Sequence, residues 1–422
     1  MLETFRNAWK VEDLRKKIIY TLIMLLIYRV GSIIPIPGVN VEYIAQQVNN
    51  VSLLGMLDFI NGNNFSNFTI FAMGISPYIT SSIIMQLLCV AIPALENLQK
   101  EGEEGRKKIA QITRVVTIAL GCIMAIGIIV GLGSGAMQRG SNANFFDYLL
   151  VFLALAAGTA LTMWIGERIT ENGVGNGISL LIFVGIIASF PGQVYTGIQS
   201  VIAKPATAWF IPLILVGIVV LVAGIVFVDG GQRRIPVQYA KRMVGRKMYG
   251  GQSTYIPLKV NSTGVMPLIF AISIIQFPGL IAQFWPTSGF ALWYGKWFAA
   301  DSWLYMVVYA LLILGFTYFY TMISFNPVEM SKNLQQNGGF IPGIRPGKPT
   351  ADYLARISNR ITLFGAIFLA VIAVIPSVLL AIAGVSTPFT ASGILIVVSV
   401  ALETSQQLEA QMMMRHYKGF MK

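Results

Sequence analysis

The chain has 422 residues, of which 55% are hydrophobic and 11% are charged, and its formal net charge at pH 7 is +12. Soluble globular domains carry about 25% charged residues, so this composition excludes an ordinary soluble enzyme and indicates a polytopic membrane protein. The positive charge would also suit a nucleic-acid-binding protein, and the location of the basic residues must decide between the two classes.

The N-terminal segment 1–17 is charged and amphipathic. Acidic residues are interspersed among its basic ones, so it is predicted to be neither a cleavable signal peptide nor a transit peptide. Ten apolar runs of about 20 residues follow, each long enough to cross the ~30 Å hydrocarbon core as a helix. The predicted spans are 18–35, 71–94, 109–131, 147–165, 178–197, 207–228, 262–283, 303–325, 360–383 and 391–409.

The basic residues are distributed unevenly between the connections on the two sides of these spans. Twenty-five of the 30 Lys and Arg residues fall on the side of both termini, and three fall on the other side. The positive-inside rule therefore predicts that both termini are cytoplasmic. The net charge follows from this topology, and the nucleic-acid interpretation loses its main support.

Residues 53–67 precede the second span and do not fit a plain span. The segment is apolar but is interrupted by Asp58, Asn61, Gly62, Asn63 and Asn64. It is either an exported surface loop or a short re-entrant helix, which is tolerated only where protein or a water-filled cavity surrounds it.

Residues that carry chemistry are scarce. No HExxH, GxSxG or P-loop pattern occurs, the only histidine is His416, and Cys89 and Cys122 both lie in apolar runs. We therefore predict no enzyme activity, no metal and no cofactor. Arg114 is expected to snorkel from its span, and the deeper Arg29 is expected either to snorkel or to bond another helix, since no acidic residue is near it in the sequence.

Six motifs in series resemble the SecY family of protein-conducting channels, and the resemblance covers essentially the whole chain. The motifs are GISPYITSSIIMQLL (74–88), EGEEGRKKI (101–109), ERITENGVGNGISLLIF (167–183), QRRIPVQYAKR (232–242), STYIPLKVNSTGVMPLIFA (253–271) and FIPGIRPGKPT (340–350).

The resemblance implies an all-α membrane fold in which ten transmembrane helices form two inverted five-helix halves around a central pore, with a short plug helix. The halves are expected at 18–197 and 207–409, with cytoplasmic loops at 229–260 and 326–360 and a cytoplasmic tail at 410–422. The implied function is to translocate unfolded secretory proteins across the bacterial plasma membrane and to release transmembrane segments laterally into it.

A pore ring of isoleucines carries over from three of these motifs and, for its last member, from SGILIVV (392–398). A flexible apolar collar would bind no passing side chain strongly and would lose water when empty, which blocks ions. Without the resemblance, each isoleucine would be read as ordinary packing in a membrane helix. The predicted ring is Ile75, Ile79, Ile178, Ile182, Ile269 and Ile396.

The resemblance also identifies the segment 53–67 as a plug that closes the outer side of the pore. A lateral gate is expected between the second and seventh spans, with Gln86 and Asn261 as polar gate residues. Asn261 could equally cap the start of the seventh span. The predicted plug residues are Leu53, Leu54, Met56, Leu57, Asp58, Phe59, Ile60 and Phe65.

The two long cytoplasmic loops are the family's docking surfaces for the SecA ATPase and for the ribosome, including its RNA near the exit tunnel. SecE, SecG, signal peptides, unfolded preproteins and membrane lipids are the other implied partners. Alternatively, the loops bind anionic lipid or only enforce topology. The predicted docking residues are Arg233, Arg234, Lys241, Arg242, Arg246, Lys247, Arg345 and Lys348.

Two other functions compete with a passive channel. A secondary transporter of a small solute would need ionisable groups near the middle of the membrane, and no Asp or Glu lies deep in any predicted span. An intramembrane enzyme would need a nucleophile with its base, or metal ligands, which the sequence lacks.

Overall fold

The computed structural model is mostly helical. It describes residues 6, 8–50, 58, 61–203, 210–239, 242–244, 247–249, 253–261, 264–282, 284–285, 288–298, 302–383 and 391–419. Each of the ten predicted spans overlaps one long helix, and the span at 71–94 also covers the preceding turn and the first residues of a second, short helix. These helices are α2 (Glu12–Gly31), α5 (Ser76–Ala91), α7 (Glu103–Leu132), α8 (Phe145–Asn172), α9 (Gly177–Ala203), α10 (Phe210–Asp229), α11 (Met266–Ala282), α13 (Trp303–Ser324), α15 (Lys348–Ala383) and α16 (Ala391–Gly419).

By length and composition alone, four long helices among the described residues can cross a membrane. They are α7, α8, α13 with its continuation, and α15. A fifth candidate is the pair of α5 and the short helix α6 (Pro93–Lys100), which is bent by 99°. The bend has a local cause: Ile92 precedes a proline, which disfavours the helical conformation, and Ile92 is extended.

Short elements connect the long helices. The helical ones are α3 (Val41–Asn50), η1 (Ser134–Ala136), η2 (Gly140–Asn142), α12 (Gly289–Trp297) and α14 (Pro327–Gln336). The strands are β1 (Gln232–Tyr239), β2 (Arg242–Val244), β3 (Lys247–Tyr249), β4 (Ser253–Lys259) and β5 (Gly339–Phe340).

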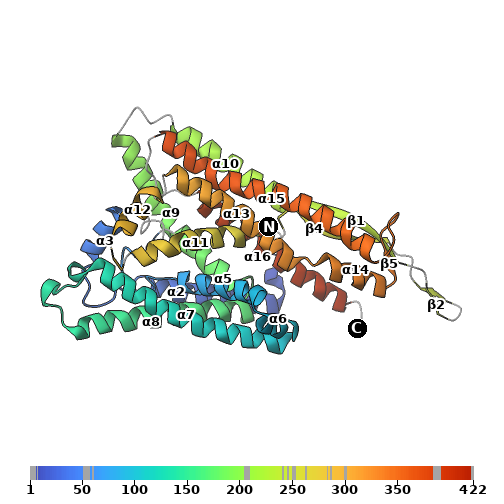
Figure 1. Cartoon of the computed structure of the whole chain (residues 1–422), viewed down its shortest axis with the longest axis horizontal. Helices are drawn as coiled ribbons and strands as arrows, with labels where there is room; N and C mark the ends of the chain where they lie inside the picture. Colours follow the sequence, from blue (N-terminus) through green and yellow to red (C-terminus); the bar gives the residue numbers. More distant parts are fainter. Residues whose placement is uncertain are drawn as a thin grey trace.

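The strands build two small antiparallel sheets, one of β4, β1 and β5 and one of β2 and β3, at one end of the molecule, which we call the sheet end (Figure 1). β1 pairs antiparallel with β4, in the register Ile235↔Ile256, and its last residues pair with β5. The two segments predicted as cytoplasmic loops are thus joined in one sheet of order β4-β1-β5. The prediction of an all-α membrane region is confirmed, and this sheet is an addition that it did not include.

Two apolar clusters position the candidate site. The first, which we call the central cluster, is formed by buried side chains of α5, α9, α11, α13 and α16, among others. The second lies around α3, α7, α8 and residues 65–73, and includes Phe65, Phe68 and Met73. In Figure 1, α7 and α8 run side by side along one flank, α10 and α15 lie along the other, and α11 runs between the two flanks.

Candidate functional site

The isoleucines of the predicted pore ring come from four separate helices and meet in the central cluster. Five of the six side chains are buried, and Ile178 is partly buried against the same cluster. The cluster contains many other apolar residues, so its packing alone does not distinguish a ring from a core. The members are Ile75 and Ile79 at the start of α5, Ile178 and Ile182 of α9, Ile269 of α11 and Ile396 of α16.

Most of the described part of the predicted plug is buried, although Asn67 at its end is exposed. Asp58, Asn64 and Phe65 are each less than a tenth exposed, which favours the re-entrant interpretation of the segment over an exported surface loop. Asp58 Oδ1 accepts hydrogen bonds from the backbone N–H groups of Phe65 and Ser66, both at 2.9 Å, and the Ser66 hydroxyl donates to Asp58 Oδ2. The other six predicted plug residues, Leu53, Leu54, Met56, Leu57, Phe59 and Ile60, lie outside the described residues.

Asn61 and its neighbours connect this segment to the start of α5. Residues 61–68 form turns, and the Asn61 side-chain amide donates to the Ala72 carbonyl at 3.3 Å. The Ile36 N–H donates to the Phe68 carbonyl at 3.0 Å, and the Ile70 N–H donates to the Ile34 carbonyl at 3.2 Å. These backbone bonds fix the segment beside the chain that leaves α2.

Gln86 forms a polar bridge between two helices that the sequence places in different halves. Its Oε1 accepts a hydrogen bond from the hydroxyl of Tyr320 on α13 at 2.7 Å, and its Nε2 donates to Ser82 Oγ at 3.3 Å. α5 also packs directly against α11. The seam predicted to form the lateral gate is therefore closed in this structure.

Asn261 does not cap α11, because that helix begins only at Met266, so the capping alternative is wrong. Instead, Asn261 Nδ2 donates to Asp229 Oδ1 at the end of α10 at 2.7 Å. A cavity of about 210 Å³ opens beside this pair, and Glu403 of α16 also lines it. Sequence reasoning missed Asp229 and Glu403 as site residues; an acidic side chain at or near the end of an apolar run was the available signal.

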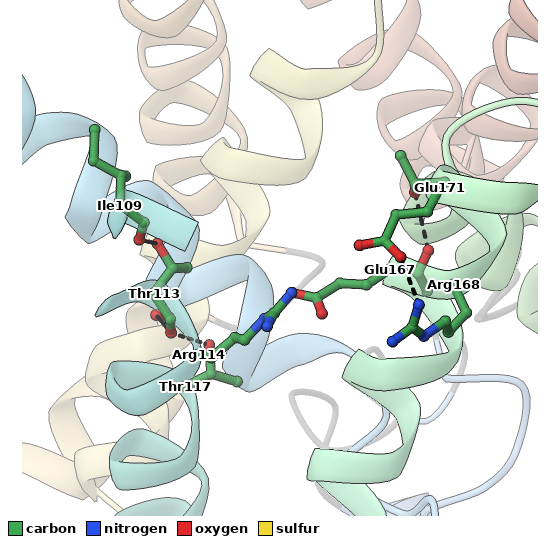
Figure 2. A network of polar contacts seen from close by, with 10 residues as sticks. Ile109, Thr113, Arg114, Thr117, Glu167, Arg168 and Glu171 are labelled. Atoms are coloured by element: carbon green, nitrogen blue, oxygen red, sulfur yellow. Dashed lines mark hydrogen bonds and ion pairs between the residues drawn. The ribbon is translucent and has the colours of Figure 1, made fainter. Parts of the chain in front are cut away.

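Arg114 has an ionic partner that the sequence interpretation did not include. Because α8 continues through Asn172, it carries Glu167, whose Oε1 lies 2.9 Å from Arg114 Nε. Figure 2 shows the two side chains meeting between α7 and α8, with Arg168 paired to Glu171 on the same helix. Arg29 also has a partner, since its Nη1 donates to the carbonyl of Gly62 at 3.3 Å.

The predicted docking residues that the structure describes lie in or next to the strands of the sheet end. Arg233 and Arg234 lie in β1 and are exposed, and the Arg234 guanidinium lies over the Tyr255 ring at 4.8 Å. Arg345 and Lys348, which follow β5, are also exposed. Arg242 and Lys247 lie in β2 and β3, and Lys241 and Arg246 lie outside the described residues. Sequence reasoning did not foresee that one sheet connects the two groups.

The SecY family model matches residues 69–405. The chain is 46% identical to the protein translocase subunit SecY of Halalkalibacterium halodurans, with 100% of both chains covered. Among solved structures, a protein-conducting channel matches with a TM-score of 0.66 at 19% identity, covering 94% of this chain and 92% of the other.

Two further structures match with the same coverage, 94% of this chain and 92% of theirs. One concerns the SecY plug domain, which stabilises the closed state of the translocation channel and maintains a membrane seal, with a TM-score of 0.63 at 19% identity. The other is Sec61 in the canine ribosome–channel complex from the endoplasmic reticulum, with a TM-score of 0.62 at 17% identity.

Proposed function

The chain belongs to the SecY family, and we propose that it forms the pore of a bacterial protein translocase. As a family member it is a multi-pass membrane protein and a channel subunit, not an enzyme. The observation that carries the proposal is the central cluster, in which isoleucines from α5, α9, α11 and α16 converge. In this proposal, the isoleucines line the constriction through which an unfolded protein passes.

The apolar character of the constriction suits a channel that must pass every side-chain type. A polar lining would bind some side chains and stall the chain, whereas isoleucines bind none strongly and exclude water from the empty pore. The described residues 61–67 and Asp58 then belong to the plug, as the related SecY structure supports. In this proposal, the buried plug residues that are described and the contacts across the gate seam belong to the resting state of the channel.

In this proposal, the gate lets a passing segment partition between the pore and the lipid. Separation of α5 from α11 and α13 would expose a passing segment to lipid, where each Leu or Ile at the centre contributes roughly −0.3 to −0.6 kcal/mol and each Asp, Lys or Arg roughly +2.5 to +3.5 kcal/mol. One charge therefore offsets several leucines, and the sequence of the segment decides between lateral release and export.

The sheet end is the proposed cytoplasmic docking surface, with both termini on the same side. Its exposed arginines, Arg233, Arg234 and Arg345, suit acidic surfaces of SecA and ribosomal RNA phosphates, which basic side chains bind without reading sequence. The ribosome-bound Sec61 structure supports a partner of this kind. SecE and SecG are the proposed companion subunits. Binding of the sheet end to anionic lipid alone remains the competing interpretation.

The alternative of a secondary transporter gains no support from the comparisons, which identify translocase subunits and protein-conducting channels. The polar contacts found between helices also favour a gate over an ion-coupling site. Arg114 is neutralised by Glu167, and Gln86 pairs with the hydroxyl of Tyr320.

Import into proteoliposomes tests the proposal. Vesicles that contain the chain with SecE and SecG should protect an unfolded secretory precursor from added protease when SecA and ATP are present. Omission of ATP and a stably folded precursor are the controls, and both should prevent protection. Intact, correctly assembled complexes that import no precursor under any of these conditions would refute the channel.

A further inference from the structure

Two adjacent residues near the end of α2 hold the described plug segment. Arg29 Nη1 donates a hydrogen bond to the Gly62 carbonyl at 3.3 Å. The Asn64 side-chain amide donates to the Tyr28 hydroxyl at 3.2 Å. The Gly62 acceptor and the Asn64 donor lie within three residues of each other, so the end of one helix contacts a single turn of the plug segment.

The Tyr28 contact is buried and is supported by ring stacking, and the Arg29 contact is partly buried. Asn64 is 0% exposed and Tyr28 is 3% exposed. The Tyr28 ring stacks on Phe71, with ring centroids 5.2 Å apart. Among the residues that the structure describes, no carboxylate forms an ion pair with Arg29, so its charge is directed at the Gly62 carbonyl. A charged donor makes a stronger hydrogen bond than a neutral one.

The turn that contains Gly62 lies against α9, next to the predicted ring. Gly62 has φ +77°, and a Cβ atom there would lie 2.8 Å from the Cα atom of Gly185. Gly185 comes about one helical turn after the ring residue Ile182. The segment therefore touches the same helix that contributes to the constriction.

The same segment also has a strained backbone and a buried polar atom without a hydrogen bond, and both raise the free energy of its position. Asn63 and Phe68 both have positive φ angles, of 63° and 40°, which cost free energy for residues other than glycine. The Oδ1 atom of Asn64 is buried and has no hydrogen-bond partner among the described atoms, which is also costly. The placement thus depends on the contacts that oppose these costs.

We propose that Tyr28 and Arg29 are positioning residues that latch the plug over the pore ring, and that opening the channel requires their release. The inference rests on the proposed function as a channel. It gives Arg29 a specific role: its hydrogen bond to Gly62 keeps the resting pore sealed.

Single-channel recording in planar bilayers tests the latch, with the chain in complex with SecE and SecG. Arg29→Met removes the charged donor, and we expect conducting events about tenfold more often than in the wild type. Tyr28→Phe removes only a neutral acceptor, and we expect a rise of about threefold. Arg114→Met is the matched control, because Arg114 pairs with Glu167 away from the plug, and its leak should equal that of the wild type.

A second background separates the latch from a general structural effect. In a chain that lacks residues 53–67, the plug partners Gly62 and Asn64 are absent, and Arg29→Met should add no further leak. A wild-type leak in Arg29→Met, or an added leak in the deleted chain, would overturn the proposal. If Arg29→Met fails to assemble, Tyr28→Phe in both backgrounds provides the same comparison.

Precursor import by the same complexes keeps the two proposals apart. Arg29→Met should still import a secretory precursor with SecA and ATP, because the latch residues seal the channel and do not drive transport. Failure of the wild type to import would refute the channel function itself. Normal import by the wild type, together with an unchanged leak in Arg29→Met, would refute the latch alone.

Discussion

In the proposed channel, the central cluster and the plug seat close the same pathway by different kinds of contact. The cluster joins isoleucines from four helices through apolar packing. The seat, which comprises Asp58 and residues 61–68, is held by a hydrogen bond that Arg29 donates to it, by one that Asn64 donates to Tyr28, and by a close approach of Gly62 to Gly185. Apolar packing has no preferred direction and is shared among many atoms, whereas a hydrogen bond depends on one donor and one acceptor.

This difference indicates which contacts of the proposed closed channel persist during transport. Loss of one member of a large apolar cluster leaves the others in contact, so the constriction should tolerate single conservative changes. Loss of one directed contact removes a defined share of the seat. We therefore expect the constriction to persist during transport while the plug moves, and substitutions can test whether the two regions differ in this way.

The largest effect should come from changing the constriction at several positions at once. Simultaneous Ile79→Ser, Ile182→Ser and Ile269→Ser replaces apolar side chains by hydroxyls on three helices, which lets water fill the pore. We expect the leak to rise at least about a hundredfold, because the roughly 1.5–3 kcal/mol of apolar transfer free energy of even one buried isoleucine corresponds to about 10- to 160-fold. Planar-bilayer conductance measures the effect.

A matched triple variant distinguishes lining from general damage. Ile23, Ile118 and Ile367 are exposed on the helix surface, and their replacement by Ser makes the same chemical change away from the central cluster. This control should conduct like the wild type. An equal leak in both triple variants would show that these three isoleucines do not line the pathway.

The spans could be predicted from the sequence because each is a long apolar run that must form a helix in lipid. The strands could not. Ile235 and Val237 are separated by a proline and flanked by polar residues over only a few positions, and part of their sheet is completed by Gly339 and Phe340, about a hundred residues later. The short apolar pattern in a charged segment gave no reason to join the two loops.

The candidate site was predictable in its residue types but not in its contacts. The ring and gate residues came from motif resemblance, since an isoleucine in an apolar helix carries no signal of its own. The partners that define the seat and the gate are distant in the sequence: Tyr320 lies 234 residues from Gln86, and Gly62 lies 33 residues from Arg29. Such pairs depend on the tertiary arrangement, which local patterns do not encode.

An intermediate effect should come from Gly62→Ala, which disturbs the packing of the seat and changes no residue of the ring. The new Cβ would meet the Gly185 backbone, and the backbone at φ +77° is strained for alanine by roughly 1–2 kcal/mol. We expect conducting events to become about tenfold more frequent in planar bilayers, by the same free-energy relation.

Gly102→Ala is the control for backbone strain, because Gly102 has φ +82° but open space around its Cβ position. Its leak should stay at the wild-type level. A rise in Gly102→Ala as large as that in Gly62→Ala would attribute the effect to strain in general and would remove the seat from the comparison.

The smallest effect should come from Tyr320→Phe, which removes the hydroxyl that donates to Gln86 across the gate seam. One neutral hydrogen bond contributes about 1 kcal/mol, so the seam should open about fivefold more readily while the plug and the ring remain intact. We expect little change in ion leak but faster import of a precursor whose signal segment has been made less apolar. Tyr318→Phe, on the same helix, is the matched control and should import this precursor at the wild-type rate. A leak in Tyr320→Phe as large as that of Gly62→Ala would instead place the seal at the gate seam, and the contrast between a permanent constriction and a releasable plug would no longer hold.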